Sequence, residues 1–497
     1  MNSPLERHQA GPPPTGLPAL EARLRQDQAW LELSARAWMP AGQHAGQAVH
    51  DVIIVGGGMA GMAACAALKH LGIKATIFDR APAGFEGPWA TTARMETLRS
   101  PKQLTGPALE LPALTFRAWF EAQYGLAAWE ALDKIPRLLW MDYLRWYRRV
   151  LALDVRNRHT VLAVRPRADR LVELTIDADG VRSAVLARRV VLATGRDGLG
   201  GPYVPACIEA LPRHRWAHSS DVLDYGRLAG KRVAVIGAGS SAMDSAATAL
   251  EEGAVSVDLL IRRPDIPRIN KSKGAGNAGF HLGFVDLPDE WKWRFRHYIN
   301  IQQVPPPRGS TLRVSRHPNA RFYLDSAVLG VTLAGDELTI ETTRGRFLAD
   351  FLIASTGFRV DWHARPEFAP IAAHIRAWKD RYTPPAGQED RELADSPDLG
   401  PAFELQQKTP GACPGLDRVH CFCYPAVLNH GPVSGDIPAI SDGARRLAQG
   451  MASLFYCEDV DKHYAALQAY DEPELLGDEW APAPLPELQS APDRTLR

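Results

Sequence analysis

Two glycine-rich segments in the sequence have the spacing of loops that bind the phosphates of a dinucleotide. The first follows the apolar run 49–55 and reads Gly56-Gly57-Gly58-Met59-Ala60-Gly61. In this pattern the first glycine allows a tight turn, the next lets the backbone approach a pyrophosphate, and the last permits close packing of helix on strand. A helix that begins after such a loop directs free N–H groups and the positive end of its dipole at the phosphates. Residues 56–61 therefore predict a dinucleotide site.

An acidic residue stands where the ribose of that dinucleotide would lie. The unit continues with a helical stretch over 60–71 and a strand-like run over 74–79, which ends in Asp79. A carboxylate at that place accepts hydrogen bonds from an adenosine ribose. A lone GxGxxG is weak evidence, but a strand, a loop, a helix and a second strand with a terminal acid together are strong evidence. We therefore assign Asp79, with its neighbour Arg80, to the cofactor site.

The second glycine-rich segment differs from the first at its ribose end. The run 231–236 precedes Gly237-Ala238-Gly239-Ser240-Ser241-Ala242, a helical stretch covers 240–252, and a strand-like run covers 257–261. That strand leads into Arg262 and Arg263 rather than into an acid. Arginine pairs with a ribose 2′-phosphate, which a carboxylate would repel. We expect NADPH rather than NADH here; the alternative is that both arginines are solvated strand-end residues.

Two dinucleotide sites in one chain imply two redox cofactors that exchange electrons. The natural assignment is FAD on the first unit and NADPH on the second, with hydride passing from nicotinamide to flavin. The predicted fold class is α/β, with two Rossmann-like dinucleotide-binding domains, the NADPH domain being inserted into the FAD domain. The expected divisions are an N-terminal extension (1–48), the first part of the FAD domain (49–205), the NADPH domain (206–345), the second part of the FAD domain with an irregular insertion (346–455), and a C-terminal helix and tail (456–497).

Composition and charge argue against several other classes of protein. The chain has 497 residues with 57 basic and 57 acidic side chains, so its formal net charge is zero. That balance argues against nucleic-acid or anionic-membrane binding. No apolar run approaches the roughly 18 residues that span a bilayer, no secretory signal is evident, and six cysteines are too few for a disulfide scaffold. We expect a cytoplasmic protein with no metal site, because the histidines lack paired-ligand spacing; whether it forms a homo-oligomer is left open.

Three further segments carry expectations about the organisation of the chain. An amphipathic stretch over 17–38 predicts one helix, and the segment 361–418, rich in Pro, Asp and Glu, predicts an irregular excursion. Basic residues alternate with aromatic ones over 291–295. Given the neutral net charge, we interpret that stretch as solvated or facing the active site rather than as a nucleic-acid surface.

The sequence resembles the NADPH-dependent flavoprotein monooxygenases over roughly residues 49–455. That group includes flavin-containing, Baeyer–Villiger and N-hydroxylating types. The matching segments are Ala193-Thr194-Gly195 and Ser355-Thr356-Gly357, which look like the two places where the chain crosses between domains, and Gly87-Pro88-Trp89, which is similar to a stretch beside the flavin. The resemblance implies that Thr194, Gly195, Thr356, Gly357 and Trp89 contact the cofactors.

Two short segments look more like the ornithine and lysine N-hydroxylases. They are Thr97-Leu98-Arg99-Ser100-Pro101 and Asn429-His430-Gly431 with the helix that follows. The resemblance implies that Arg99 and His218 serve catalysis and that Lys102 belongs to the lining of the flavin site. It also implies that Asp436 binds the ribityl or pyrophosphate region of FAD, or else caps the following helix.

The same resemblance implies a reaction. It predicts an FAD- and NADPH-dependent monooxygenase that acts on a small nitrogen- or sulfur-containing substrate and O2 through a C4a-hydroperoxyflavin. The alternative is an NADPH-dependent flavin oxidase or reductase that oxygenates no substrate.

Overall fold

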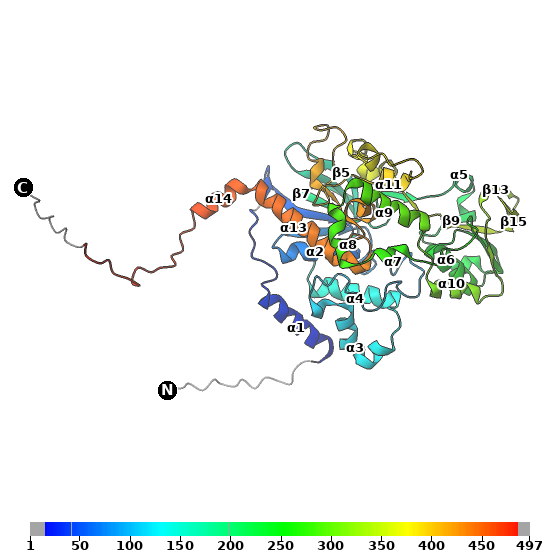
Figure 1. Cartoon of the computed structure of the whole chain (residues 1–497), viewed down its shortest axis with the longest axis horizontal. Helices are drawn as coiled ribbons and strands as arrows, with labels where there is room; N and C mark the ends of the chain where they lie inside the picture. The colour runs from blue at the N-terminus through cyan, green and yellow to red at the C-terminus, as the bar shows by residue number, and fades with distance from the viewer. Residues whose placement is uncertain (1–14, 41, 197, 486–497) are drawn as a thin grey trace, which may run out of the picture.

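The computed structural model describes residues 15–40, 42–196 and 198–485, which form a larger body and a smaller lobe (Figure 1). The sheet of the body has the strand order β4-β3-β2-β7-β6-β5, and β1 also pairs with β2 and β18 with β7. Its strands are β1 (Gln43–His44), β2 (Gln47–Val55), β3 (Ala75–Asp79), β4 (Val155–Asn157), β5 (His159–Pro166), β6 (Val172–Ala178), β7 (Val181–Leu192) and β18 (Val419–Cys421). β2 pairs in parallel with β3 and with β7. The predicted first β-α-β unit is thus the centre of this sheet.

Helices cover the body sheet and bury its apolar strands. α2 (Met59–His70), which connects β2 to β3, packs against α13 (Ile440–Glu458). α3 (Phe116–Ala131) and α4 (Arg137–Val150) contribute an aromatic cluster in which Trp140 and Tyr143 are fully buried. α4 is amphipathic: one face carries these buried rings and packs on the core, and the opposite face carries basic side chains.

The smaller lobe is a second parallel sheet with the strand order β12-β11-β10-β16-β9. Its strands are β9 (Trp216–His218), β10 (Arg232–Ile236), β11 (Ser256–Leu260), β12 (Ala320–Tyr323) and β16 (Phe351–Ala354), and α6 (Ser240–Glu251) connects β10 to β11. A three-stranded antiparallel sheet accompanies it, made of β13 (Val328–Ala334), β14 (Glu337–Thr342) and β15 (Gly345–Ala349). Because β16 pairs with β10, the second sheet continues beyond residue 345, at which the sequence analysis ended this domain.

A short antiparallel pair of strands connects the body and the lobe. β8 (Gly200–Pro202) carries the chain out of the body, and β17 (Phe358–Val360) carries it back. The amide of Tyr203 donates to the carbonyl of Gly357 at 2.8 Å, which extends the pairing by one bond. The chain therefore crosses twice at one place, directly after the two segments that the sequence analysis identified as crossings.

The remaining helices are mostly short. They are α1 (Gly16–Trp30), α5 (Ala206–Glu209), α7 (Lys271–Ala275), α8 (Ala278–Gly283), α9 (Asp289–Gln302), α10 (Arg308–Ser315), α11 (Arg391–Asp395), α12 (Val427–His430) and α14 (Val460–Gln468). The 3₁₀ turns are η1 (Pro112–Leu114), η2 (Arg213–Arg215), η3 (Tyr225–Leu228), η4 (Phe284–Asp286), η5 (Trp362–Ala364), η6 (Pro366–Phe368), η7 (Ala372–His374), η8 (Trp378–Asp380), η9 (Leu416–Arg418), η10 (Tyr424–Ala426) and η11 (Ile437–Ala439). None of the helices in the described ranges is both long and apolar enough to cross a membrane.

Two expectations about these segments are corrected and one is confirmed. The helix expected over 17–38 ends at Trp30, because the following residues turn away in bends. The basic and aromatic stretch 291–295 belongs to α9, and Trp291, Arg294 and Phe295 are exposed as expected. Lys292 and Trp293 are buried instead, Trp293 in a cluster with Trp378, so these two residues correct the expectation. Residues 361–418 are irregular as expected, with 3₁₀ turns and the short α11. Beyond α13, α14 and the extended segment that follows project from the body (Figure 1).

A cluster of buried charges fixes the end of α13 to the body sheet. Glu458 forms ion pairs with Arg418 (3.1 Å), Arg188 (3.3 Å) and Arg189, and its side chain is 12% exposed. Burial acts against the ionised carboxylate, but the three arginines outweigh it and lower the pKa of Glu458. The charge of Glu458 therefore stabilises the fold at neutral pH.

We expect Glu458→Gln to destabilise the protein by about 3–5 kcal/mol, because it leaves buried arginines without their counter-charge. The matched control is Glu341→Gln on β14, where the partner Arg346 and the glutamate are both exposed and the loss should stay below about 1 kcal/mol. Urea denaturation of the three proteins at pH 7 measures this. Because the pKa of Glu458 is lowered by folding, its contribution is lost as the pH falls through that lowered value, so the difference should shrink in acid. Equal midpoints for parent and Glu458→Gln at pH 7 would contradict the assignment.

Candidate functional site

The first glycine-rich loop forms the turn between β2 and α2. Gly56 has a φ of +106°, and a Cβ there would lie 2.5 Å from the carbonyl oxygen of Ala193. A Cβ on Gly61 would lie 1.9 Å from the oxygen of Gly56, so both positions require glycine. A Cβ on Gly58 would meet only the Cα of Gly87, at an ordinary contact distance of 3.7 Å, and no side chain caps α2, which begins at Met59. The first N–H groups of α2 are thus available to a phosphate, which fits the predicted cofactor.

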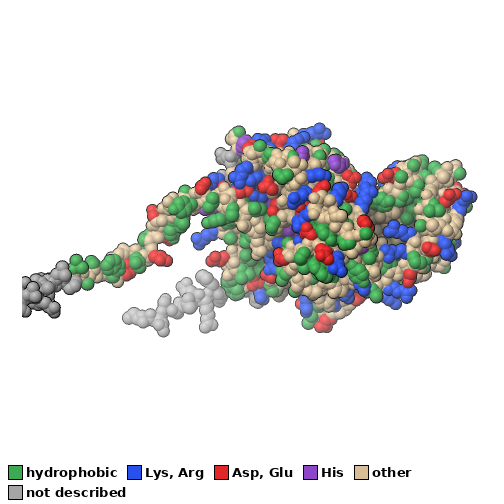
Figure 2. Space-filling view, turned by 45° about the horizontal axis from the view of Figure 1, so that its top comes forward, with side chains coloured by type: hydrophobic (Ala, Val, Ile, Leu, Met, Phe, Trp, Pro, Cys, Tyr) green, Lys and Arg blue, Asp and Glu red, His purple; other side chains and the backbone are tan. Residues whose placement is uncertain are grey.

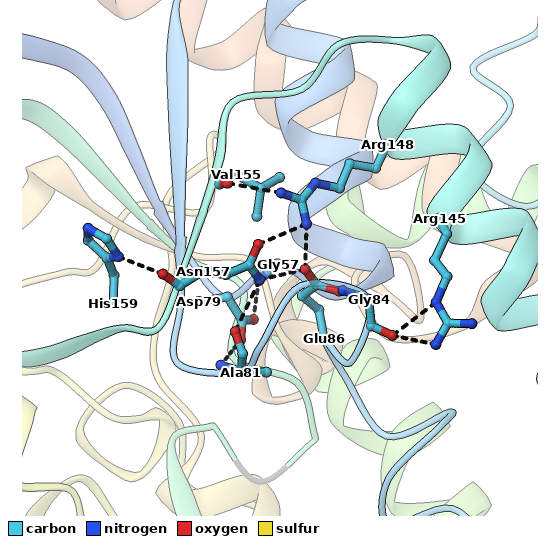
Figure 3. Close-up of polar contacts among 10 residues, drawn as sticks. All are labelled: Gly57, Asp79, Ala81, Gly84, Glu86, Arg145, Arg148, Val155, Asn157 and His159. Atoms are coloured by element: carbon cyan, nitrogen blue, oxygen red, sulfur yellow. Dashed lines mark hydrogen bonds and ion pairs between the residues drawn. The ribbon is translucent and has the colours of Figure 1, made fainter. Parts of the chain in front are cut away.

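Asp79, at the end of β3, ties this loop to the segment that follows the strand (Figure 3). Its carboxylate accepts hydrogen bonds from the amides of Gly57 (2.6 Å) and Ala81 (2.7 Å). A carboxylate offers about four lone pairs, so it retains capacity for ribose hydroxyl groups. Its neighbour Arg80 is exposed. The position of Asp79 fits the ribose-binding role expected from the sequence.

A buried glutamate beside Asp79 was missed by the sequence analysis. Glu86 is 4% exposed and accepts hydrogen bonds from Arg148 and from the side-chain amide of Asn157, both at 2.6 Å, and from the amide of Gly84 at 2.9 Å (Figure 3). These contacts hold the loop after β3 against α4 and β4. No motif marks these residues, because their partners are 62 and 71 positions away along the chain.

The second glycine-rich loop repeats the geometry of the first at the end of β10. Gly237 has a φ of +124°, and a Cβ there would lie 2.6 Å from the carbonyl oxygen of Ser355. A Cβ on Gly239 would meet nothing within 4 Å, and no side chain caps α6. Ser240 and Ser241 form the first turn of this helix. The backbone is therefore open to a second pyrophosphate, as the sequence predicts.

The two arginines after β11 differ in their contacts. Arg262 is exposed and makes no hydrogen bond or ion pair with any residue that the structure describes. Arg263 is partly buried and donates to the carbonyl of Ile301 at 2.8 Å. Arg262 therefore keeps all of its donors for a ribose 2′-phosphate, whereas Arg263 has a structural contact of its own.

The crossing segments lie directly against the two loops. Gly195 and Gly357 both have left-handed backbones, with φ of +84° and +88°. Thr356 donates its hydroxyl to the carbonyl of Tyr203, while the buried hydroxyl of Thr194 has no hydrogen-bond partner among the described residues. Thr194 and Thr356 thus take equivalent places beside the first and second loop.

Arg99 bridges the body and the lobe. Its guanidinium donates to the carbonyl of Pro305 at 2.6 Å and to the hydroxyl of Ser240 at 3.4 Å. Burial lowers the pKa of Arg99, and the nearby Asp436 opposes that shift; an arginine remains charged under both influences. A fixed positive charge therefore stands beside the open N-terminus of α6, where it suits an anionic nucleotide.

The other expected site residues have different surroundings. Lys102 donates to the carbonyls of Trp129 (2.7 Å), Glu130 (3.2 Å) and Leu132 (2.5 Å), so all three of its donors are engaged at the end of α3. These contacts favour a structural role for Lys102. The indole of Trp89 packs edge-on against Trp140, with ring centroids 6.4 Å apart.

His218 lies at the crossing rather than in the open. It is 2% exposed at the end of β9, its Nδ1 lies 2.7 Å from the hydroxyl of Ser220, and its ring packs edge-on against Phe358 at the start of β17. These contacts place His218 where the two domains meet.

Asp436 gathers charged side chains from several segments around it. It makes no capping hydrogen bond to η11, so the capping alternative is not what the structure shows. Burial raises the pKa of Asp436, and Arg296, Arg196, His281 and Arg99 oppose the shift. Its side chain is nevertheless accessible to solvent, a combination typical of a recess. Lys and Arg side chains gather along the junction of body and lobe (Figure 2).

Comparison with known proteins finds a relative along nearly the whole chain and family models over parts of it. The chain is 39% identical over 463 residues to the FAD-dependent urate hydroxylase of Xanthomonas campestris pv. campestris, which covers 93% of this chain and 98% of that protein. Residues 121–286 match the L-lysine 6-monooxygenase/L-ornithine 5-monooxygenase family, and residues 54–134 match an NAD(P)-binding Rossmann-like domain.

Solved structures show the same fold. The ornithine N-hydroxylase of Kutzneria sp. 744 superimposes with a TM-score of 0.65 at 18% identity, over 82% of this chain and 99% of that one. The L-lysine 6-monooxygenase of Pseudomonas syringae gives 0.63 at 17% identity, over 81% and 99%. The predicted architecture of two dinucleotide-binding domains is thereby confirmed.

We expect Arg262→Ala to raise the KM for NADPH roughly ten- to a hundredfold and to leave the KM for NADH almost unchanged. The lost contact is a charge-assisted hydrogen bond to the 2′-phosphate, worth about 1.5–3 kcal/mol. Arg263→Ala is the control and should have a smaller effect, because its guanidinium is bound to Ile301. Steady-state kinetics with both nucleotides measure the ratio. A parent enzyme that prefers NADH would show that Arg262 and Arg263 do not bind the 2′-phosphate. An unchanged ratio of the two KM values in both variants would show the same.

Proposed function

The chain belongs to the family of FAD-dependent flavoprotein monooxygenases, and on this premise we propose that it uses NADPH and O2 to hydroxylate urate or a closely related nitrogen heterocycle. The observation that carries the proposal is the pair of open helix N-termini, at α2 and α6, on the two sides of one crossing. Each follows a loop in which glycine is sterically required. The overall likeness to a urate hydroxylase supports the choice of substrate.

The chain's own residues have defined tasks in this proposal. Bound FAD and NADPH supply the redox chemistry and the activation of O2. Asp79 holds the first loop in shape and accepts hydrogen bonds from the ribose, while the N–H groups of α2 bind its phosphates. Arg99 holds the lobe to the body through Pro305 and presents its charge at Ser240. Burial of the crossing, where His218 is 2% exposed, keeps water from this side of the site.

A second candidate is N-hydroxylation of an amino-acid side chain. The match of residues 121–286 to the lysine and ornithine monooxygenases favours it. Against it stand the arginines around Asp436, because a cationic amine would be repelled by them. We therefore rank the heterocycle above the amine. We also propose that the protein works in the cytoplasm, since NADPH is supplied there.

The direct test is turnover of the FAD-loaded protein with NADPH and O2 in the presence of urate, lysine or ornithine. We expect urate to accelerate NADPH oxidation and to give a product that carries one oxygen atom from labelled O2, as detected by mass spectrometry. Product from an amine instead of urate would support the second candidate. NADPH oxidation that yields only hydrogen peroxide with every substrate would show an oxidase and overturn the proposal.

A further inference from the structure

Among the described residues, the buried side chain of Arg296 near Asp436 has no close counter-charge. Arg296, on α9, is 6% exposed and makes no hydrogen bond or ion pair within the described part of the chain. Its Nε is fully buried without a partner. A buried guanidinium is unfavourable unless an anion or hydrogen-bond acceptors satisfy it. The group therefore points to a ligand rather than to a structural ion pair.

Two carboxylates face Arg296 at longer range. Asp436 and Glu392, on α11, both interact with it electrostatically, although neither forms an ion pair with it. Burial raises the pKa of each carboxyl group, and the neighbouring arginines oppose that shift without cancelling it. Because neither forms an ion pair with Arg296, they do not neutralise it as a close partner would.

A second arginine near Asp436 lies over an aromatic ring. Arg196 follows the first crossing segment, and its Cζ lies 3.8 Å from the ring centroid of Tyr424 on η10. Burial acts to lower the pKa of Arg196, but Tyr424, Glu392 and Asp436 together raise it, so its charge is secure. A guanidinium in cation–π contact with a ring still has N–H groups that can donate to a planar acceptor. Its side chain is accessible to solvent, unlike that of Arg296.

These groups converge from segments far apart in the sequence. α9 packs against both α11 and α12, and Asp436 interacts with Arg99, Arg196 and Arg296. Arg196 follows the first crossing segment, and Arg99 contacts Ser240 of the second loop, so the convergence is connected to both dinucleotide units. One planar ligand placed there would meet two arginines and two weakly acidic carboxyl groups.

We propose that Arg296 and Arg196 form the subsite that binds the planar, oxygen-rich anionic edge of the substrate, with Asp436 and Glu392 binding its ring N–H groups. The assignment rests on the proposed function, because it takes urate as the representative ligand. Arg196 donates hydrogen bonds in the plane of the substrate ring, and Arg296 supplies the buried positive charge. Both are specificity-determining residues for the heterocycle and leave the cofactors unaffected.

The test uses FAD-loaded protein and titrates it with urate and with caffeine, an uncharged purine, following the absorbance change of the flavin. We expect Arg296→Met and Arg196→Gln each to weaken urate binding at least tenfold and to change caffeine binding less than twofold. Arg296→Lys, which restores the charge, should recover part of the urate affinity. Arg294→Met is the matched control on α9, because Arg294 is exposed and pairs with Glu290; it should bind urate like the parent.

Flavin content and the rate of flavin reduction by NADPH separate this subsite from a cofactor role. We expect both to match the parent in Arg296→Met and Arg196→Gln. Loss of FAD, or parent-like urate binding in both variants, would overturn the assignment while leaving the proposed function in place. A parent protein that neither binds nor oxygenates urate would overturn the proposed function as well. If Arg296→Met does not fold, the accessible Arg196→Gln decides alone.

Discussion

Close contact between a strand-end carbonyl and a glycine of the neighbouring strand is the constraint on which both halves of the molecule depend. Gly56 lies against Ala193 in the body, and Gly237 lies against Ser355 in the lobe. A side chain at either glycine would collide with these carbonyls, so each loop must leave its sheet beside a crossing segment. Since both crossings join in the pair β8 and β17, the two loops open toward one junction. This packing would bring the phosphate-binding loops for the two cofactors to the same part of the molecule.

Charge is distributed to match that arrangement. The whole chain is formally neutral, yet Arg99, Arg196 and Arg296 converge on Asp436, and Arg262 is exposed directly after β11. Positive charge is thus placed where nucleotide phosphates and an anionic substrate would lie. The body balances its own buried arginines internally, with Glu458 holding the end of α13. Around Asp436, by contrast, Arg296 has no ion-pair partner among the described residues.

The sequence predicts those parts of the structure that depend on residues close together along the chain. The glycine spacing, the apolar strands and Asp79 could be identified from sequence because a parallel β-α-β unit needs only about thirty consecutive residues. Glu86 could not, since Arg148 and Asn157 reach it from distant segments. Nor could Arg296, which lies one residue beyond the stretch 291–295 interpreted as solvated or facing the active site, because its burial depends on the packing of α9. The resemblance placed Lys102 in the lining of the flavin site. In the structure Lys102 donates to backbone carbonyls at the C-terminal end of α3, and this contact depends on tertiary packing.

Anaerobic mixing of the FAD-loaded protein with NADPH tests the central claim, that two nucleotide loops open toward one junction. We expect NADPH to bleach the flavin absorbance of the parent. We expect Gly239→Val to leave the flavin oxidised, because the added side chain enters space that is open beside the second loop. Gly330→Val, whose Cβ likewise meets no neighbour, should be reduced like the parent. Flavin that NADPH cannot reduce, or a Gly239→Val protein reduced as fast as the parent, would contradict the account.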